Sequence, residues 1–182
     1  MKIERYIEIT PTSVVLDGKA IEVKETGDKM LVELYRRYAG DYPKFFKMDT
    51  HSRLGFIAAE ILIKSTERFA DRVQNTDCAV ILANKSASIK NDTDYLQTIS
   101  NGNYYPSPAL FVYTLPNIVT GEIAIRHQLH GETAFYILEK PEDLEPIIQS
   151  QMTNHQSPIL CGWCECDKPN SYYAKIQIIW NN

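Results

Sequence analysis

Three cysteines near the end of the sequence come closest to a metal-binding motif. Cys161-Gly-Trp-Cys164-Glu-Cys166 contains one C-x-x-C step, and His155 lies six residues upstream of Cys161. Zinc takes about four Cys or His ligands, and a C-x-x-C turn can supply two of them. The sequence has no second such pair, and within a strand Cys161 and Cys164 would point to opposite faces. We therefore favour buried structural thiols. A metal-binding module through Cys161, Cys164 and Cys166 is the alternative.

Two histidines have a spacing that could also serve a metal. His127 and His130 stand at i and i+3 in a predicted helix, and Glu132 is the one acidic residue close by. Histidines near the carboxyl end of a helix are also favoured by its dipole, and we adopt this interpretation. The sequence lacks a G-x-S-x-G nucleophile elbow and a Gly-rich phosphate loop. We therefore predict no catalytic residue, no metal and no cofactor.

Composition excludes several classes of protein. The chain has 182 residues and a net charge of -4, which predicts one domain over residues 1–182 and gives no basic surface for nucleic acid or an anionic membrane. The first residues lack the pattern of a signal peptide, and no apolar stretch approaches the roughly 20 residues of a spanning helix. We expect a cytoplasmic protein that keeps its four cysteines reduced.

The elements that must position these residues follow from hydrophobic periodicity, caps and turn signals. The predicted helices are residues 28–40, 50–72, 94–100, 117–129 and one opened by Pro141; the predicted strands lie within 3–24 and at 77–84, 132–138, 159–166 and 173–180. This alternation indicates an α/β fold with a largely parallel sheet. Residues 167–172 are too few for a helical crossover, so the last strand should be antiparallel. The polar segment 85–108 is expected to cover a site or an interface.

Three segments in order resemble the N-terminal half of β-ketoacyl synthases, the condensing enzymes with the thiolase fold. Residues 42–54 carry Lys44-Phe-Phe-Lys-Met-Asp49, similar to the family's K-x-x-R-M-D link before an alanine-rich helix. Residues 108–131 carry Leu115-Pro-Asn117, then Gly-Glu-Ile-Ala-Ile and a later glycine, similar to the family's L-P-N…G-x-V-A-I…G string. Residues 159–165 are similar to the strand that ends in G-G-x-E. The resemblance spans roughly residues 40–180.

The resemblance implies a thiolase-like half: a mixed five-stranded sheet with its last strand antiparallel, covered by helices. It also places the cysteine that accepts the acyl chain near Lys140, where the sequence reads Leu138-Glu-Lys-Pro141. Lysine cannot form the thioester. The family's two catalytic histidines belong to a C-terminal half without counterpart in these residues. We therefore expect the fold and the ancestry of a condensing enzyme without its activity.

The family also implies an interface, because the strand equivalent to residues 132–138 pairs across two subunits. Aromatic side chains are enriched in interface cores. The residues expected there are Tyr104, Tyr105, Phe111, Tyr113, Phe135 and Tyr136. The same strand carries Ile137, and for Phe135 and Ile137 a place in the core of the sheet is the alternative.

The first functional hypothesis is a non-catalytic, ketosynthase-like accessory subunit for fatty-acid or polyketide-type biosynthesis, as inactive chain-length-factor subunits are. Its partner would be a ketosynthase-like protein or an acyl carrier protein, with a homodimer also possible. The second hypothesis is a small acyl-thioester-binding protein or enzyme that uses a residual cleft near Thr114, Asn117 and His127. The metal-binding module is the third.

Overall fold

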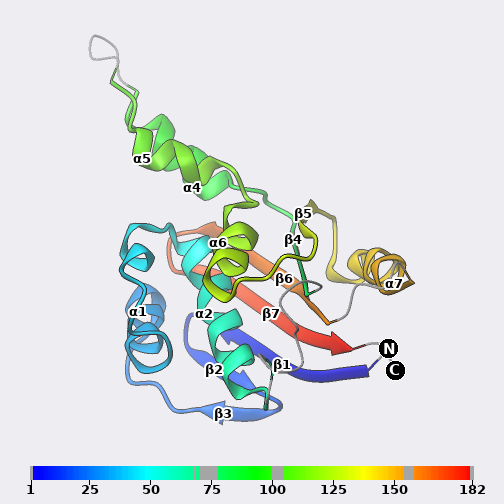
Figure 1. Ribbon diagram of the computed structural model, residues 1–182. Helices are drawn as coiled ribbons and strands as arrows, with labels where there is room; N and C mark the ends of the chain where they lie inside the picture. Colours follow the sequence, from blue (N-terminus) through cyan, green and yellow to red (C-terminus); the bar gives the residue numbers. More distant parts are fainter. Residues whose placement is uncertain (1, 68, 70–77, 100–104, 154–157, 181–182) are drawn as a thin grey trace.

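The computed structural model describes residues 2–67, 69, 78–99, 105–153 and 158–180, and one sheet runs through this part of the chain (Figure 1). The sheet has seven strands in the order β3-β2-β1-β7-β6-β4-β5. The strands are β1 Lys2–Thr10, β2 Ser13–Leu16, β3 Lys19–Ile21, β4 Ala79–Asn84, β5 Thr133–Ile137, β6 Ile159–Lys168 and β7 Ser171–Trp180.

The strand directions confirm the predicted mixed sheet. β4 is parallel to β5 and β6, while β7 is antiparallel to both of its neighbours, β6 and β1. Among the five strands outside the β2-β3 hairpin, β1, β6, β4 and β5 therefore run one way, and β7, the last strand of the chain, runs the other way. The sheet has seven strands instead of five because the hairpin β2-β3 extends it beyond β1. The predicted turn at Asp17 and Gly18 joins these two strands with positive φ at both residues.

Three helices cover one face of the sheet: α1 Gly27–Tyr38, α2 Thr50–Ser65 and α6 Ile118–His127. α2 is buried along most of its length, and it packs on the sheet and against both α1 and α6. Asp49 caps it by accepting hydrogen bonds from the backbone amides of His51 and Ser52. The predicted end near residue 72 is wrong. α2 ends at Ser65, where the hydroxyls of Ser65 and Thr66 bond back to the Leu62 carbonyl.

The other face of the sheet is covered by the short 3-10 helix η3 Pro141–Leu144 and by α7 Glu145–Thr153. Pro141 opens this segment as predicted. Leu144, Ile148 and Met152 pack on β4 and β6 in a second core cluster. The chain therefore has three layers, with the sheet in the middle (Figure 1).

A helical arm projects from this body (Figure 1). It comprises α4 Ile89–Leu96, α5 Pro108–Phe111 and the 3-10 helix η2 Val112–Thr114, and "the arm" below means residues 89–99 and 105–114. The helix predicted at 94–100 begins five residues earlier, and α5 had no counterpart in the prediction. A further 3-10 helix, η1 Pro43–Lys47, lies between α1 and α2.

No single helix in the described ranges is long and apolar enough to cross a membrane. The segments Pro108–Thr114 and Ile118–His127 meet that length and composition only as a pair, and they are bent by 94°.

Candidate functional site

The four cysteines are free thiols in the core of the molecule. Cys78, Cys164 and Cys166 belong to the cluster between the sheet and α2, whereas Cys161 belongs to the cluster under α7, which confirms the predicted opposite faces. Burial raises the pKa of Cys78, Cys161 and Cys166 to about 12, so these thiols stay protonated. Within the described residues, no group of three or more His, Cys, Asp or Glu could hold a metal ion. His155 lies outside the described residues.

Charged side chains meet where the parallel strands end. Lys85 follows β4 and Glu139 follows β5, and their Nζ and Oε2 atoms are 2.7 Å apart. This contact raises the pKa of Lys85 and lowers the pKa of Glu139. Glu165 of β6 accepts a hydrogen bond of 2.8 Å from the Lys85 amide and another from the Ser86 hydroxyl. The groups at this edge bind one another, and together they tie the three strand ends.

Lys140 occupies the position at which the resemblance places the acyl-accepting cysteine. Its Nζ atom lies 4.0 Å from Asp143 Oδ1, and 64% of its side chain is exposed. This residue directly precedes η3, and its side chain makes no capping hydrogen bond there.

His51, which no motif in the sequence singles out, contacts two of these strands, β6 and β5. It is buried in the first turn of α2, and its Nε2 atom lies 3.0 Å from the Cys164 carbonyl oxygen. Because the partner is a carbonyl, Nε2 must carry the hydrogen. Burial lowers the pKa of His51, so the ring is neutral. The rings of His51 and Phe135 pack in a T-shaped arrangement, with 5.4 Å between ring centroids. His51 therefore joins α2 to β6 and β5.

The structure does not bring the three residues of the predicted residual cleft close together. Asn117 precedes the first residue of α6, and His127 is the last one. Ten residues of helix separate their backbones by about 15 Å. Thr114 lies on the Asn117 side, where its hydroxyl bonds to the Phe111 carbonyl at 2.7 Å.

His127 instead belongs to a buried ion cluster around Glu60 of α2. Glu60 Oε1 lies 2.7 Å from Arg126 Nε and 3.2 Å from His127 Nε2, and Glu60 Oε2 lies 3.2 Å from Lys64 Nζ. Burial alone would raise the pKa of Glu60, but the hydrogen bonds from His127 and Arg126 outweigh it and lower the pKa to about 2. The cluster holds α6 against α2.

The aromatic residues expected at an interface fall into two groups. Tyr105 is 83% exposed and Phe111 is 55% exposed, and both lie on the arm. Tyr113 is half-buried and packs against the core at the base of the arm, while Phe135 and Tyr136 are half-buried on opposite faces of β5. Tyr104 lies outside the described residues.

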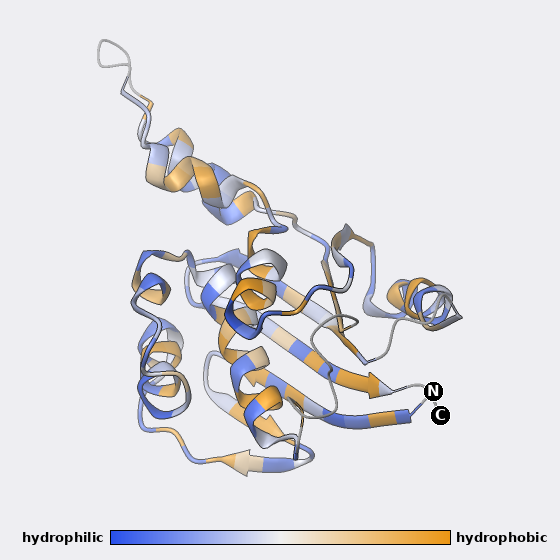
Figure 2. Ribbon diagram, viewed as in Figure 1, coloured by the Kyte–Doolittle hydropathy of each residue, from blue (hydrophilic) through white to orange (hydrophobic). Residues whose placement is uncertain are grey.

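The arm also exposes aliphatic side chains that were not expected from the sequence. Ile89 and Leu96 stand seven residues apart on α4, on the same side of the helix, and this spacing is the signal that could have identified them. The exposed apolar residues of the arm and its exit are Ile89, Leu96, Tyr105, Phe111, Val112 and Leu115. Figure 2 shows these apolar bands along the projecting helices.

Buried hydrogen bonds hold the base of the arm. Ser88 donates its hydroxyl to the Thr114 carbonyl at 2.7 Å, and Asn91, which is 2% exposed, donates to the Tyr113 carbonyl at 3.0 Å. The same Asn91 amide donates to Asp49, the cap of α2. The two segments of the arm are thus joined to each other and to the central helix.

Comparison of the structure with solved structures finds the thiolase-like fold of ketosynthases. One match is a chain from a complex of a ketosynthase (ApeO) with its chain length factor (ApeC) from Xenorhabdus doucetiae, with a TM-score of 0.65 and 10% identity over 100% of this chain and 79% of that one. Another is a chain of the ishigamide ketosynthase/chain length factor, with a TM-score of 0.66 and 16% identity over 96% of this chain and 61% of that one. No family model matches the sequence, and neither does any curated protein.

Proposed function

We propose that this chain is a cytoplasmic, single-domain accessory subunit in fatty-acid or polyketide-type biosynthesis, without condensing activity of its own. It pairs with a ketosynthase-like protein through the arm and the edge strand β5. The fold supports the proposal, because both similar structures are described as ketosynthases with chain length factors.

The arm is the observation that carries the proposal. It is anchored by buried, satisfied hydrogen bonds, which fix its position relative to α2. Leu96, Tyr105 and Phe111 nevertheless remain more than half exposed. A rigidly held segment that leaves its own apolar surface in water has the character of a protein–protein contact.

Strand β5 supports the same surface. It ends the sheet order, so within the described residues its outer edge has no strand partner. Ile137, at the end of β5, is 50% exposed. The sequence of β5, Thr-Ala-Phe-Tyr-Ile, contains none of the charged residues or prolines that protect exposed strand edges against pairing. An edge of this kind accepts a strand from a partner.

The absence of condensing activity rests on the residues at the family's catalytic positions. Lys140 stands where the nucleophile is expected, and three of the cysteines have pKa values of about 12 in the core. We expect no acyl-thioester on the isolated chain.

Co-expression with a ketosynthase from the same genome, followed by size-exclusion chromatography with light scattering, tests the pairing. We expect a complex of the two chains, which Leu96→Asp combined with Phe111→Asp disrupts. Ile125→Asp is the matched control, because Ile125 is 67% exposed on α6, outside the arm.

Three outcomes would overturn the ketosynthase assignment. The chain could stay at 20.8 kDa in the presence of the ketosynthase, or form a homodimer that excludes it. It could also bind an acyl carrier protein alone, which would make the carrier the partner.

A further inference from the structure

A hollow lies along α1, and none of its lining residues belongs to the arm or to β5. It has a volume of about 800 Å³ and is bounded by α1 and by the segment that leads into it. Its rim carries four cations, Lys24, Lys29, Arg36 and Arg37, and Val32 lies in its lining. "The α1 groove" below means this hollow.

The cations of the α1 groove lack carboxylate partners in the described structure. Arg37 donates to the Glu22 carbonyl oxygen at 3.1 Å and stacks over the Tyr38 ring. Elsewhere on the surface, Arg5 pairs with Asp17 and Lys175 pairs with Glu8. The groove therefore keeps positive charge free on a protein whose net charge is -4.

Two carboxylates reach the groove, and one of them is already occupied by backbone groups. Glu33 accepts hydrogen bonds from the amides of Lys24 and Glu25 at 2.9 Å each, so it fastens the lead-in segment to α1. Glu25 is exposed, and four cations against two carboxylates leave the groove positive.

The positions of these residues define the shape of an occupant. Lys29, Val32 and Arg36 stand at i, i+3 and i+7, on one face of α1 and opposite the buried Leu31 and Leu34. The two cations are therefore about 10 Å apart along the helix, with an apolar position between them. Carboxylates two turns apart on a facing helix, with an apolar residue between, would match this pattern.

We propose that the α1 groove is a docking site for an acidic helix of a partner protein. Nucleic acid and anionic membranes are extended polyanions, and the overall charge of -4 opposes them beyond the few cations of the groove. In Figure 1, α1 lies on the opposite side of the body from β5, and no residue that lines the groove belongs to the arm or to β5, so the groove and the proposed ketosynthase surface share no residues. The docking proposal does not depend on the proposed pairing with a ketosynthase-like protein.

A labelled helical peptide of about four turns, with Glu-x-x-Leu-x-x-x-Glu as its central face, is the probe. Fluorescence anisotropy with the full chain should show binding at about 20 mM NaCl that weakens at least about tenfold at about 300 mM. The same peptide with Gln in place of Glu should not bind.

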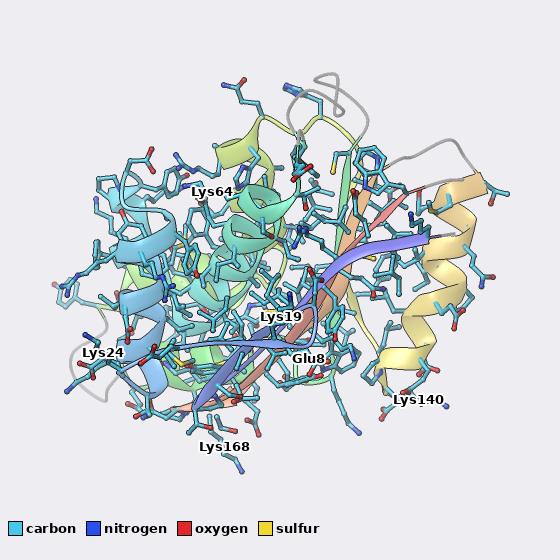
Figure 3. All side chains as sticks on the ribbon, turned by 90° about the horizontal axis from the view of Figure 1, so that it is seen from below. Glu8, Lys19, Lys24, Lys64, Lys140 and Lys168 are labelled. Carbon is cyan, nitrogen blue, oxygen red and sulfur yellow. The ribbon has the colours of Figure 1, made fainter. Side chains whose placement is uncertain are left out.

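Charge reversal locates the site. Lys29→Glu combined with Arg36→Glu should remove binding, whereas Lys19→Glu combined with Lys168→Glu, with the same change of net charge at other exposed lysines, should retain it. Figure 3 shows Lys24 beside α1, with Lys19 and Lys168 elsewhere on the molecule. Circular dichroism confirms that each variant is folded.

The proposal is overturned if the α1 variant binds the peptide as the wild type does, if the Gln peptide binds equally, or if nothing binds at low salt. It is also overturned if duplex DNA or phosphatidylserine vesicles displace the peptide at lower anion concentration than unlabelled peptide does.

Discussion

The side-chain amide of Asn91 donates to the carboxylate of Asp49, 42 residues earlier in the chain. Asp49 is at the same time the cap of α2, so one carboxylate joins the start of the central helix to the base of the arm. The position of the exposed arm thus depends on the half-buried residue that caps the central helix.

Asn91→Ala should loosen the arm while the body remains folded. The change leaves the Tyr113 carbonyl and one Asp49 oxygen without this donor, and a lost partner of this kind costs about 1–3 kcal/mol. Hydrogen exchange should become faster in residues 89–99 and 105–114. Thr93→Ala, at an exposed position of α4, is the control. Unchanged exchange in the arm would show that Asn91 is not its anchor.

Glu60→Gln should destabilise the protein strongly at neutral pH. It removes the carboxylate that contacts Arg126, His127 and Lys64 and leaves Arg126 with Asp41 as its partner; breaking a buried pair from one side costs up to about 3–5 kcal/mol. Urea unfolding measures the change. Glu132→Gln, an exposed carboxylate, is the control and should have little effect. Equal losses in the two variants would refute the role of the cluster.

The Glu60 cluster should also show a defined pH dependence. The folded pKa of about 2 lies below the ordinary 4.5, so the carboxylate stabilises the fold above pH 4.5, and this contribution is lost as the pH falls toward 2. The stability difference between wild type and Glu60→Gln should therefore shrink across this window. A difference that stays constant would mean that Glu60 titrates normally.

His51 should weaken the fold in mild acid. Its folded pKa is lowered by burial below 6.5, so protonation favours the unfolded chain, and stability declines as the pH falls below about 6.5. His51→Gln keeps an amide donor for the Cys164 carbonyl and cannot titrate, so its unfolding free energy should depend less on pH. His130→Gln, at an exposed site, should keep the wild-type dependence. Identical slopes in all three proteins would contradict this assignment.

The cysteine thiols should not react with thiol reagents in the native protein. With a pKa of about 12, only about one thiol in ten thousand is ionised at pH 8, so a disulfide reagent should find almost none before denaturation and four afterwards. Stoichiometric labelling of the folded chain, or labelling that depends on a metal chelator, would favour the metal-binding alternative.

Local sequence patterns by themselves determine much of the architecture. Period-two alternation in residues 159–166 places Cys161 and Cys164 on opposite faces, and the sheet clusters confirm it. The short connection after β6 requires an antiparallel β7, because a crossover needs more chain. The cap of α2 is local as well, because Asp49 accepts hydrogen bonds from the amides two and three residues further on. Each of these depends on neighbours within a few residues.

The tertiary structure alone decided how distant polar groups pair. His127 contacts Glu60, 67 positions earlier, and not Asn117, because the length of α6 keeps its two ends apart. The fold also brings Asn91 to Asp49. The cations of the α1 groove, in contrast, have no carboxylate partners within the described ranges, because the fold leaves them in solvent. Periodicity tells which face of an element is buried. Which element covers that face depends on the sum of long-range contacts, and a local pattern does not contain it.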